Sequence, residues 1–280
     1  MFYLLKSFIQ MKTLLNNNDL NEALKNISDL GFIPTMGSLH KGHISLIKKS
    51  LKECKKTIVS IFVNPNQFDN KNDFRKYPRN NRRDLRILKS LNVHFAYLPN
   101  IRDIYNSKRS IQIKLLKKDR ILCAKFRKGH FEGVIDIMDR LTKIVSPNKI
   151  YMGEKDFQQL HLVKKYIQKR YKSKIISCKT VRNSNKLALS SRNILLKKKD
   201  QVIAEKVIKS LLDFKKNLHK KKNLDKIIIS KKNELEKLFN ISVEYLELRK
   251  IKSLNKSNNT YNSKIFIAFY INKIRLIDNF

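Results

Sequence analysis

The stretch PTMGSLHKGH, residues 34–43, indicates most about the fold of this 280-residue chain. A short apolar run precedes it at 31–35, and apolar residues with helical spacing follow it at 43–54. The stretch is therefore predicted to join a strand to a helix through a glycine-containing turn. Because a helix N-terminus presents N–H groups and a positive dipole, this turn is predicted to bind a phosphate.

Strand-like and helix-like stretches alternate through the first two-thirds of the chain. Strands are predicted at 57–63, 93–98, 149–152 and 174–178, and helices at 79–91, 131–145 and 157–168. Repeated strand–helix–strand units imply an α/β fold, a Rossmann-like parallel sheet with right-handed crossovers. Ligands bind such sheets beyond the carboxyl ends of the strands, where the loops 35–41, 64–68 and 153–156 are expected.

After about residue 182 the sequence changes character. Lysine-rich helical stretches at 201–216 and 224–239 precede alternating apolar runs at 243–248, 265–270 and 274–277, with a hairpin loop at 255–263. We therefore predict a Rossmann-like domain over residues 1–182 and a smaller α+β domain over residues 183–280.

The chain has a formal net charge of +39, from 62 Lys and Arg against 23 Asp and Glu. Such a charge raises nucleic acid or an anionic membrane as partners. The lysines are spread along the whole chain, and aromatic residues are not interleaved with them as a base-stacking surface requires. Since Lys, Asn and Ile all have A/T-rich codons, compositional drift is favoured over a specific nucleic-acid site, which stays the rival interpretation.

Cysteine usage and hydropathy indicate a cytoplasmic protein. The three cysteines lie far apart without a CxxC pair, as expected of free thiols rather than of a disulfide framework or a zinc site. No stretch reaches the roughly 18 uninterrupted apolar residues of a membrane span, so no membrane partner is predicted. The apolar start, residues 1–15, has charges inside the run and no small-residue cleavage site, so an amphipathic helix is expected there.

His40 and His43 stand three residues apart where the helix is predicted to begin, so both face the same side. Imidazole N–H groups there can donate to phosphate oxygens as charge moves onto a leaving pyrophosphate. The alternatives are a metal pair or ordinary surface histidines. Since no third ligand has a suitable spacing, phosphate contact is favoured and no protein-held metal is predicted.

HxGH after a first strand resembles the nucleotidylyl-transferase superfamily, and the whole stretch PTMGSLHKGH is similar to one family in it, the pantoate–β-alanine ligases. Further segments match that family in the same order: VSIFVNPNQF at 59–68, KYPR at 76–79, GEKDFQQL at 153–160, LALSSRN at 187–193 and RLIDN at 275–279. The resemblance covers essentially the whole chain. It implies an ATP-dependent condensation of pantoate with β-alanine to pantothenate, through a pantoyl-adenylate, with release of pyrophosphate and AMP. It also implies Mg²⁺ with the ATP phosphates and a homodimer.

The resemblance implies an ATP site made of two parts of the chain. His43, His40 and Lys155 are the catalytic candidates, with His43 foremost as the donor to developing phosphate charge. The expected ATP-binding residues are Met36, Gly37, Ser38, Leu39, His40, Lys41, Gly42, His43, Gly153, Glu154, Lys155, Asp156, Val181, Leu189, Ser190, Ser191 and Arg192. Asp156 has two open roles, since it could cap the next helix or meet a ribose hydroxyl or a Mg²⁺-bound water.

Pantoate and β-alanine are expected at Asn64, Gln67 and Gln159, whose amides suit the hydroxyls and carboxylate of a short polar acid. An adenylyltransferase acting on a phosphorylated acceptor is the second rival interpretation. It is disfavoured because Gln67 and Gln159 are neutral where a phosphate would require cations.

One segment departs from the family pattern. The family usually reads Arg-Pro-Gly-His-Phe-x-Gly-Val, and this chain has Lys128 between Arg127 and Gly129. Loss of the proline loosens the turn, because the unfolded chain gains conformational freedom. Arg127 is a further candidate for substrate contact, and His130 is expected to be structural. Three histidines lie outside any motif and are expected to be ordinary positions: His94, His161 and His219.

Overall fold

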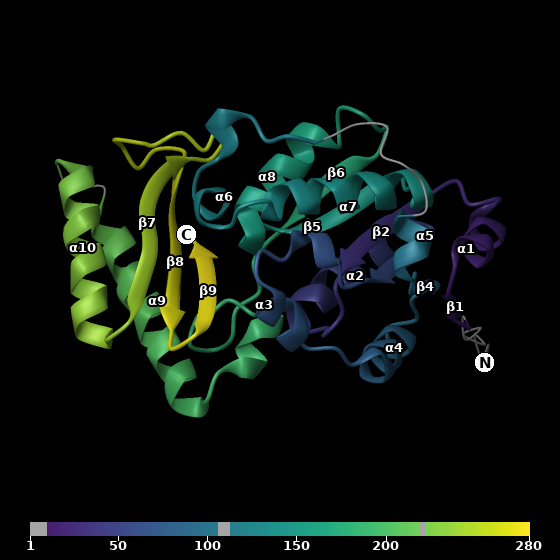
Figure 1. The fold of residues 1–280 in the computed structure, drawn as a ribbon, viewed down its shortest axis with the longest axis horizontal. Helices are drawn as coiled ribbons and strands as arrows, with labels where there is room; N and C mark the ends of the chain where they lie inside the picture. Colours follow the sequence, from purple (N-terminus) through teal and green to yellow (C-terminus); the bar gives the residue numbers. More distant parts are fainter. Residues whose placement is uncertain (1–9, 106–112, 219–221) are drawn as a thin grey trace, which may run out of the picture. The chain divides into compact units, whose positions relative to one another are not determined.

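The computed structural model describes residues 10–105, 113–218 and 222–280 (Figure 1). The chain forms two compact units. The first comprises Met1–Asp119, Arg127–Gly153 and Gln159–Cys178, and the second comprises Arg120–Phe126, Glu154–Gln158 and Lys179–Phe280. Two short segments from the first two-thirds of the chain thus belong to the second unit. A single boundary between residues 182 and 183 stays a prediction.

The first unit is built on a parallel sheet, as the sequence predicted, and this sheet has six strands (Figure 1). Its strands, in order across the sheet, are β1 (Lys12–Leu14), β4 (Phe95–Tyr97), β3 (Lys56–Ile61), β2 (Leu30–Thr35), β5 (Lys149–Gly153) and β6 (Lys174–Cys178). After β4 the chain crosses back and β5 pairs with the free side of β2, so the strand order reverses between β2 and β5. In open α/β sheets the ligand lies at such a reversal, beyond the carboxyl ends of the two strands.

Helices cover the sheet, so its central strands are buried on both faces. Phe32 and Ile33 of β2, and Ile58 and Val59 of β3, are fully buried, which explains the continuous apolar runs in these strands. The helices of this part of the chain are α1 (Asn17–Leu24), α2 (Lys41–Glu53), α3 (Lys71–Lys76), α4 (Asn81–Ser90), α5 (Ile101–Tyr105), α7 (His130–Val145) and α8 (Phe157–Tyr166), with 3-10 turns η1 (Pro65–Gln67) and η2 (Lys117–Asp119).

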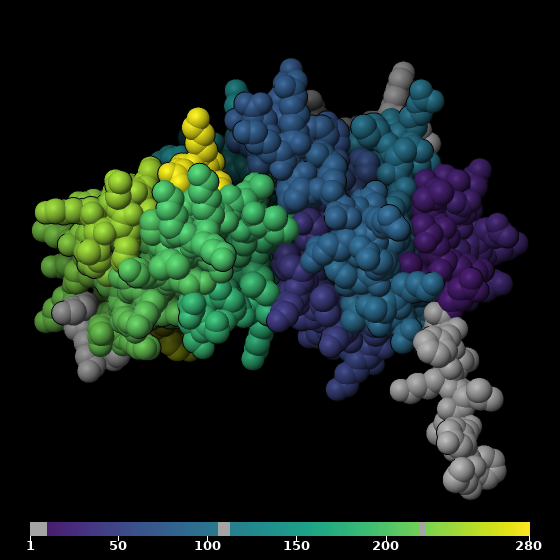
Figure 2. Space-filling model, turned by 90° about the horizontal axis from the view of Figure 1, so that it is seen from below, coloured from purple at the N-terminus to yellow at the C-terminus, as the bar shows by residue number. Residues whose placement is uncertain are grey.

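The second unit packs two helices on a three-stranded antiparallel sheet. The sheet has the order β7 (Ser242–Lys250), β8 (Ser263–Ile271), β9 (Ile274–Asn279), and the helices are α9 (Lys198–Leu218) and α10 (Leu224–Phe239). Buried residues of both helices, such as Ile208 and Leu235, share a core with Ile267 and Phe269 of β8. The lysine-rich sides of α9 and α10 lie at the surface, where residues of this range are drawn in green (Figure 2). Shorter elements are α6 (Cys123–Phe126), η3 (Glu154–Asp156) and η4 (Ser191–Leu195).

Asparagine has an unusual share in the turns of this protein. The chain has only six glycines. Ten residues other than glycine have positive φ in the described part of the chain, and five of them are asparagines: Asn92, Asn223, Asn240, Asn262 and Asn272. Asparagine also caps helices, since the side chains of Asn16, Asn70 and Asn80 accept backbone N–H groups in the first turns of α1, α3 and α4.

The longer predicted helices and strands of both units are confirmed, with small shifts at their ends. The helix expected over residues 1–15 is wrong for Lys12–Leu14, which form β1 and pair in parallel with β4. Residues 1–9 and His219 lie outside the described residues. None of the described helices combines the length and the apolarity that a membrane crossing requires.

Candidate active site

The turn that follows β2 is fastened to β3. Gly37 and Ser38 both have left-handed backbone angles, with φ of 77° and 51°. The Thr35 hydroxyl donates to the carbonyl of Ser60 in β3 at 2.7 Å and accepts the N–H of Gly37 at 3.1 Å. These two hydrogen bonds of the Thr35 hydroxyl therefore fix the conformation of the turn.

A carboxylate from α4 holds the next two residues of the turn. Asp84 is fully buried, and its oxygens accept the N–H groups of Ser38 and Leu39 at 2.7 and 2.8 Å. Arg83 donates to the Leu39 carbonyl at 3.1 Å. Sequence reasoning missed Asp84, because it lies in a helix whose polar pattern is that of an ordinary surface helix.

His40 and His43 lie at the start of α2 with their rings in contact, 4.1 Å apart between centroids. Nδ1 of His40 accepts the N–H of Gly42 at 3.1 Å, and Nδ1 of His43 accepts the N–H of His40 at 3.4 Å. A neutral imidazole whose Nδ1 accepts a hydrogen bond carries its proton on Nε2. Both rings therefore offer Nε2–H as their donor.

The start of α2 differs in one respect from the sequence expectation. The N–H of Gly42, expected to be free for a phosphate, donates to His40 instead. A Cβ at position 42 would lie 2.7 Å from the His40 ring, so glycine leaves room for that ring. Of the other predicted residues here, Met36 is half-buried and Lys41 is exposed. The donors that this helix start provides for an anion are therefore imidazole N–H groups rather than the N–H of Gly42.

Asn64 and Gln67 lie at the turn η1, beyond the carboxyl end of β3. Asn64 is fully buried, and its Nδ2 donates to Oε1 of Gln67 at 3.3 Å and to the carbonyl of Gly133 at 3.2 Å. Its Oδ1 accepts the hydroxyl of Tyr105 at 2.7 Å and the N–H of Asn66 at 3.3 Å. Asn64 thus orients the amide of Gln67. Direct contact between Asn64 and substrate stays a prediction.

Gly153 ends β5, and Gln159 lies half-buried in the first turn of α8. Both belong to the first unit, together with the turn after β2 and with η1. The first unit therefore carries all three amides predicted for pantoate and both histidines predicted for ATP.

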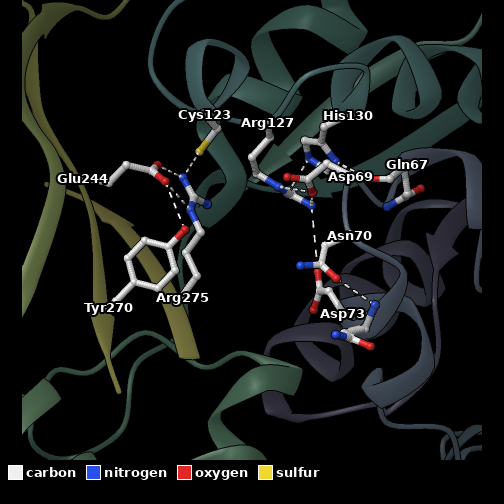
Figure 3. A network of polar contacts seen from close by, with 11 residues as sticks. Gln67, Asp69, Asn70, Asp73, Cys123, Arg127, His130, Glu244, Tyr270 and Arg275 are labelled. Carbon is white, nitrogen blue, oxygen red and sulfur yellow. Dashed lines mark hydrogen bonds and ion pairs between the residues drawn. The ribbon is translucent and has the colours of Figure 1, made fainter. Parts of the chain in front are cut away.

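The guanidinium of Arg127 already contacts two protein side chains. Its guanidinium contacts Oδ1 of Asp69, with Nε at 3.0 Å and the terminal nitrogen at 2.9 Å, and it also contacts Nε2 of His130 at 2.9 Å (Figure 3). The contact between Arg127 and substrate that the sequence suggested stays a prediction.

In the second unit, the turn η3 carries Lys155. The Lys155 ammonium lies 3.4 Å from Oδ1 of Asp156. The side-chain amide of Asn279, at the end of β9, donates to the carbonyls of Glu154 and Lys155, both at 2.9 Å. The sequence showed that RLIDN belongs to the family pattern, and the structure shows its purpose: Asn279 fixes the main chain of the turn that bears Lys155.

A tight hairpin carries the other predicted ATP residues of the second unit. The N–H of Leu189 donates to the carbonyl of Val181 at 3.0 Å. Between them, Arg182 forms a bidentate ion pair with the buried Asp278 of β9, at 2.6 and 2.9 Å. The hairpin is thereby held to the small sheet.

The segment after this hairpin contains Ser190, Ser191 and Arg192. Ser190 caps η4, since its hydroxyl accepts the N–H of Arg192 at 3.3 Å. Ser191 is buried and Arg192 is half-buried. The second unit thus carries Glu154, Lys155, Asp156, Val181, Leu189 and these three residues.

Arg275, at the start of the RLIDN segment, builds a separate network in the second unit. It pairs with Glu244 of β7 and donates to the sulfur of Cys123 at 3.3 Å (Figure 3). The hydroxyl of Tyr270 donates to Glu244 at 3.1 Å. These contacts fasten α6 to the small sheet.

Comparisons with known proteins agree with this geometry. Residues 6–280 match the family model described as pantoate-beta-alanine ligase. The pantothenate synthetase of Francisella tularensis subsp. novicida (strain U112) is 40% identical over 268 residues, which cover 94% of this chain and 93% of that protein. The pantothenate synthetase of Azobacteroides pseudotrichonymphae genomovar. CFP2 is 40% identical over 285 residues, 99% of this chain and 98% of that protein. A crystal structure of pantoate-beta-alanine ligase from Francisella tularensis, complexed with beta-gamma ATP and beta-alanine, matches with a TM-score of 0.83 at 37% identity and covers 97% of each chain.

Proposed function

This chain belongs to the pantoate-beta-alanine ligase family, and from that membership we infer that it joins pantoate to β-alanine with ATP. The observation that carries the inference for this chain's own residues is the histidine pair at the start of α2. Both rings have Nδ1 occupied by a backbone N–H, so both offer Nε2–H as a donor. Such donors stabilise negative charge on a phosphate without moving during the reaction.

The reaction has two steps. The pantoate carboxylate attacks the α-phosphorus of ATP, which forms a pantoyl-adenylate and releases pyrophosphate. The amine of β-alanine then attacks the acyl carbon of the adenylate, which forms the amide bond and releases AMP, and the amine loses a proton. Catalysis rests on positioning and electrostatics, with no covalent enzyme intermediate.

Each part of the site has a role in these steps. His43, His40 and Lys155 stabilise charge on the phosphates, with Ser190, Ser191 and Arg192 as further donors. The remaining predicted ATP residues contact the nucleotide: Met36, Gly37, Ser38, Leu39, Lys41, Gly42, Gly153, Glu154, Asp156, Val181 and Leu189. Gln67 and Gln159 hold pantoate through hydrogen bonds to its hydroxyls and carboxylate, and Asn64 contributes its amide to the same site and orients Gln67.

The described residues fit a Mg²⁺ ion that arrives with ATP. No group of three or more His, Cys, Asp or Glu side chains that could hold a metal occurs among them. Mg²⁺ commonly takes its ligands from substrate phosphates and water with one or two carboxylates, and Asp156 is a carboxylate beside Lys155 that would serve as such a ligand. When bound, the ion would neutralise phosphate charge.

We extend the proposal to the chain's organisation. Residues 1–182 bind ATP and pantoate, and residues 183–280 act as the lid that shields the adenylate from water. The family resemblance supports a homodimer, and three buried free thiols, Cys54, Cys123 and Cys178, support a reducing cytoplasmic location. Light scattering on the purified chain tests the dimer.

ATP–pyrophosphate exchange with pantoate and without amine tests the proposed function. We expect labelled pyrophosphate to enter ATP only when pantoate is present, because the first step is reversible and needs no amine. Added β-alanine should then yield pantothenate and AMP in equal amounts. Absence of both pantoate-dependent exchange and AMP formation would contradict the proposed function.

A further inference from the structure

We propose that His130, held in place by Arg127 and Asp69, is a positioning residue that orients Gln67 and so sets the affinity for pantoate. The proposal rests on the proposed role of Gln67 in binding pantoate. The four side chains lie in the first unit (Figure 3). His130 was expected from the sequence only as a structural residue.

The hydrogen bonds of His130 fix which ring nitrogen carries the proton. A terminal nitrogen of Arg127 lies 2.9 Å from Nε2 of His130. A guanidinium has donors and no acceptor, so Nε2 must accept and the proton of the neutral ring is on Nδ1. Nδ1 lies 2.6 Å from the carbonyl oxygen of Gln67 and therefore donates to it. The structure thus contains a directed chain from Arg127 through His130 to the main chain of Gln67.

Asp69 keeps Arg127 in the orientation that this chain requires. Its carboxylate pairs with the guanidinium at 2.9 and 3.0 Å, and Asp73 lies 3.9 Å from the same group. Burial alone would raise the pKa of Asp69, but the Arg127 charge and the hydrogen bonds to the carboxylate together outweigh burial, and the pKa lies below its usual value. Asp69 is therefore ionised at neutral pH, and its two short contacts with the guanidinium make the pair directional.

The side chain of Gln67 is fixed from the other side. Nδ2 of Asn64 donates to Oε1 of Gln67 at 3.3 Å, which leaves the NH₂ group of Gln67 as its outward donor. Asn64 is in turn fixed by the Gly133 carbonyl and the Tyr105 hydroxyl. His130 therefore holds the main-chain carbonyl of Gln67, and Asn64 holds its side-chain amide. The remaining NH₂ group of Gln67 suits an oxygen acceptor such as the carboxylate or a hydroxyl of pantoate.

The turn η1 needs these external contacts. It is only three residues long, and the N–H of Phe68 closes its end by donating to the carbonyl of Pro65 at 3.2 Å. Helix α7 approaches it so closely that a Cβ on Gly133 would lie 2.1 Å from the carbonyl oxygen of Asn66. His130 is the first residue of that helix, so its hydrogen bond to the Gln67 carbonyl couples the position of Gln67 to that of α7. A displacement of about 1 Å in a substrate-binding group is enough to lower a rate on the order of 100-fold.

A double-mutant cycle tests the proposal, with KM for pantoate and KM for ATP measured separately. We expect Gln67→Ala and His130→Ala each to raise KM for pantoate about tenfold or more, with KM for ATP nearly unchanged. If His130 acts through Gln67, the double variant will resemble Gln67→Ala alone, because the orienting bond has nothing left to orient. His130→Asn, whose NH₂ can replace Nδ1–H, should recover part of the loss.

Two further variants and a stability measurement separate this role from a purely structural one. Arg127→Gln should raise KM for pantoate less than His130→Ala does. In a chain that already carries Gln67→Ala, it should have no further effect on that KM. Lys128→Ala, an exposed neighbour in the same segment, is the matched control and should change neither KM. Thermal unfolding of every variant shows whether it folds. If His130→Ala does not fold, the double-mutant cycle is measured with Arg127→Gln and Gln67→Ala instead.

The outcomes distinguish this inference from the proposed function. An unchanged KM for pantoate in Gln67→Ala would remove the assigned role of Gln67, and this inference with it. A raised KM in Gln67→Ala with an unchanged KM in His130→Ala overturns this inference alone. Losses in His130→Ala that affect ATP and pantoate equally, and that add to those of Gln67→Ala, would likewise overturn it and leave a structural role.

Discussion

At the scale of single residues, the chemistry of the site depends on which side-chain atoms the backbone has already engaged. Two backbone N–H groups set the tautomer of the neutral His40 and His43 rings, because each occupies Nδ1 and leaves the proton on Nε2. The sequence revealed the histidines and their spacing. It could not reveal the tautomer, which depends on the conformation of the turn and not on the identity of the residues.

His43→Ala removes one of these two donors. We expect kcat to fall about 100-fold or more, since a preorganised donor to a developing charge is typically worth that much. Thermal stability should change little, because His43 is only half-buried and its hydrogen bond from the His40 N–H is long, at 3.4 Å. Steady-state kinetics give the result, with Lys48→Ala on the exposed side of α2 as control. Near wild-type turnover in His43→Ala would show that this ring is not the donor.

Asp84 tests how much the active-site turn depends on one carboxylate. Asp84→Asn replaces one acceptor by an NH₂ group, which would then face the N–H of Ser38 or Leu39. A buried N–H left without an acceptor costs about 1–3 kcal/mol, so we expect urea unfolding to show a loss of that size. Turnover should fall as well, because the displaced turn carries His40. Arg82→Asn, exposed on the same helix, is the control. If Asp84→Asn were as stable as the wild type, the turn would not need both hydrogen bonds from the Ser38 and Leu39 N–H groups.

Three residues whose roles the sequence did not reveal share one property. Asp84 and Asn279 act on backbone atoms of segments far away in the chain, and Asp278 pairs with the distant Arg182. Such a role leaves no local pattern of spacing or hydropathy. The predicted ATP and pantoate residues were accessible to sequence reasoning because their motifs are contiguous.

At the scale of elements, the turn before α7 explains the departure at Lys128. The N–H of His130 donates to the carbonyl of Arg127 at 3.2 Å, and Gly129 has φ of 79° and ψ of −13°. These are the features of a type II turn with glycine in its third position. Proline is favoured in the second position of such turns, which Lys128 occupies. The turn therefore keeps its geometry without the proline and loses only the restriction that proline places on the unfolded chain.

Lys128→Pro should accordingly stabilise the protein. We expect an increase of about 0.4–1 kcal/mol in the free energy of unfolding, because the proline reduces the freedom of the unfolded chain. Urea denaturation measures it, and Lys128→Ala separates the effect of the lost charge. Lower stability of Lys128→Pro than of Lys128→Ala would show that the backbone at this position does not accept proline.

His94 makes the stability of the fold depend on pH. Its Nδ1 accepts the N–H of Thr57 at 3.2 Å. Burial, with the nearby Lys56 charge in second place, lowers the pKa of His94 below the ordinary 6.5. The unfolded chain therefore binds the proton first as pH falls. Stability from this group is complete above about pH 6.5 and is lost as pH falls through the lower folded pKa.

We expect the melting temperature to fall between pH 7.5 and pH 5, and to fall less in His94→Asn. The Asn oxygen can accept the Thr57 N–H and does not titrate. His161, whose pKa burial also lowers, is present in both proteins, so the difference between them isolates His94. Equal losses in the two proteins would rule out His94 as a source of acid sensitivity.

Long elements were predictable, whereas several short ones were not. The buried strand β3 and the helices α7 and α10 have strong apolar periods, and the structure places them where the sequence did. The strand β1 is three residues long, and α3 has no buried residue. A short element has too few residues for a period, and it forms because neighbouring segments supply its partners.

At the scale of the whole molecule, the two units do not follow a single boundary in the chain. Residues 120–126 and 154–158 belong to the second unit, where Arg275 and Asn279 hold them. Lys155 therefore belongs to the same compact unit as Ser190 and Arg192. A sequence read in order predicts boundaries, and it misses segments that pair with residues more than a hundred positions away.

The net charge of +39 also belongs to the whole molecule. If it reflects composition and not a nucleic-acid site, binding to a short single-stranded RNA should be weak at about 150 mM salt, with Kd no tighter than about 10⁻⁶ M and no preference among sequences. Fluorescence anisotropy across a salt series measures this. A Kd near 10⁻⁸ M or tighter for one sequence would instead establish a specific nucleic-acid partner.

The asparagines in left-handed turns have a consequence that does not involve the free energy of folding. Asparagine is among the residues that degrade on prolonged heating, whereas glycine has no side chain to lose. Each hydrolysed amide leaves a carboxylate, and at Asn92, Asn223, Asn240, Asn262 or Asn272 that carboxylate would stand in a turn with positive φ. A warmed preparation would therefore drift toward more acidic isoforms, one unit of charge at a time. By using asparagine at positive φ, where glycine is the residue generally favoured, this protein acquires a chemical lifetime that is separate from its thermodynamic stability.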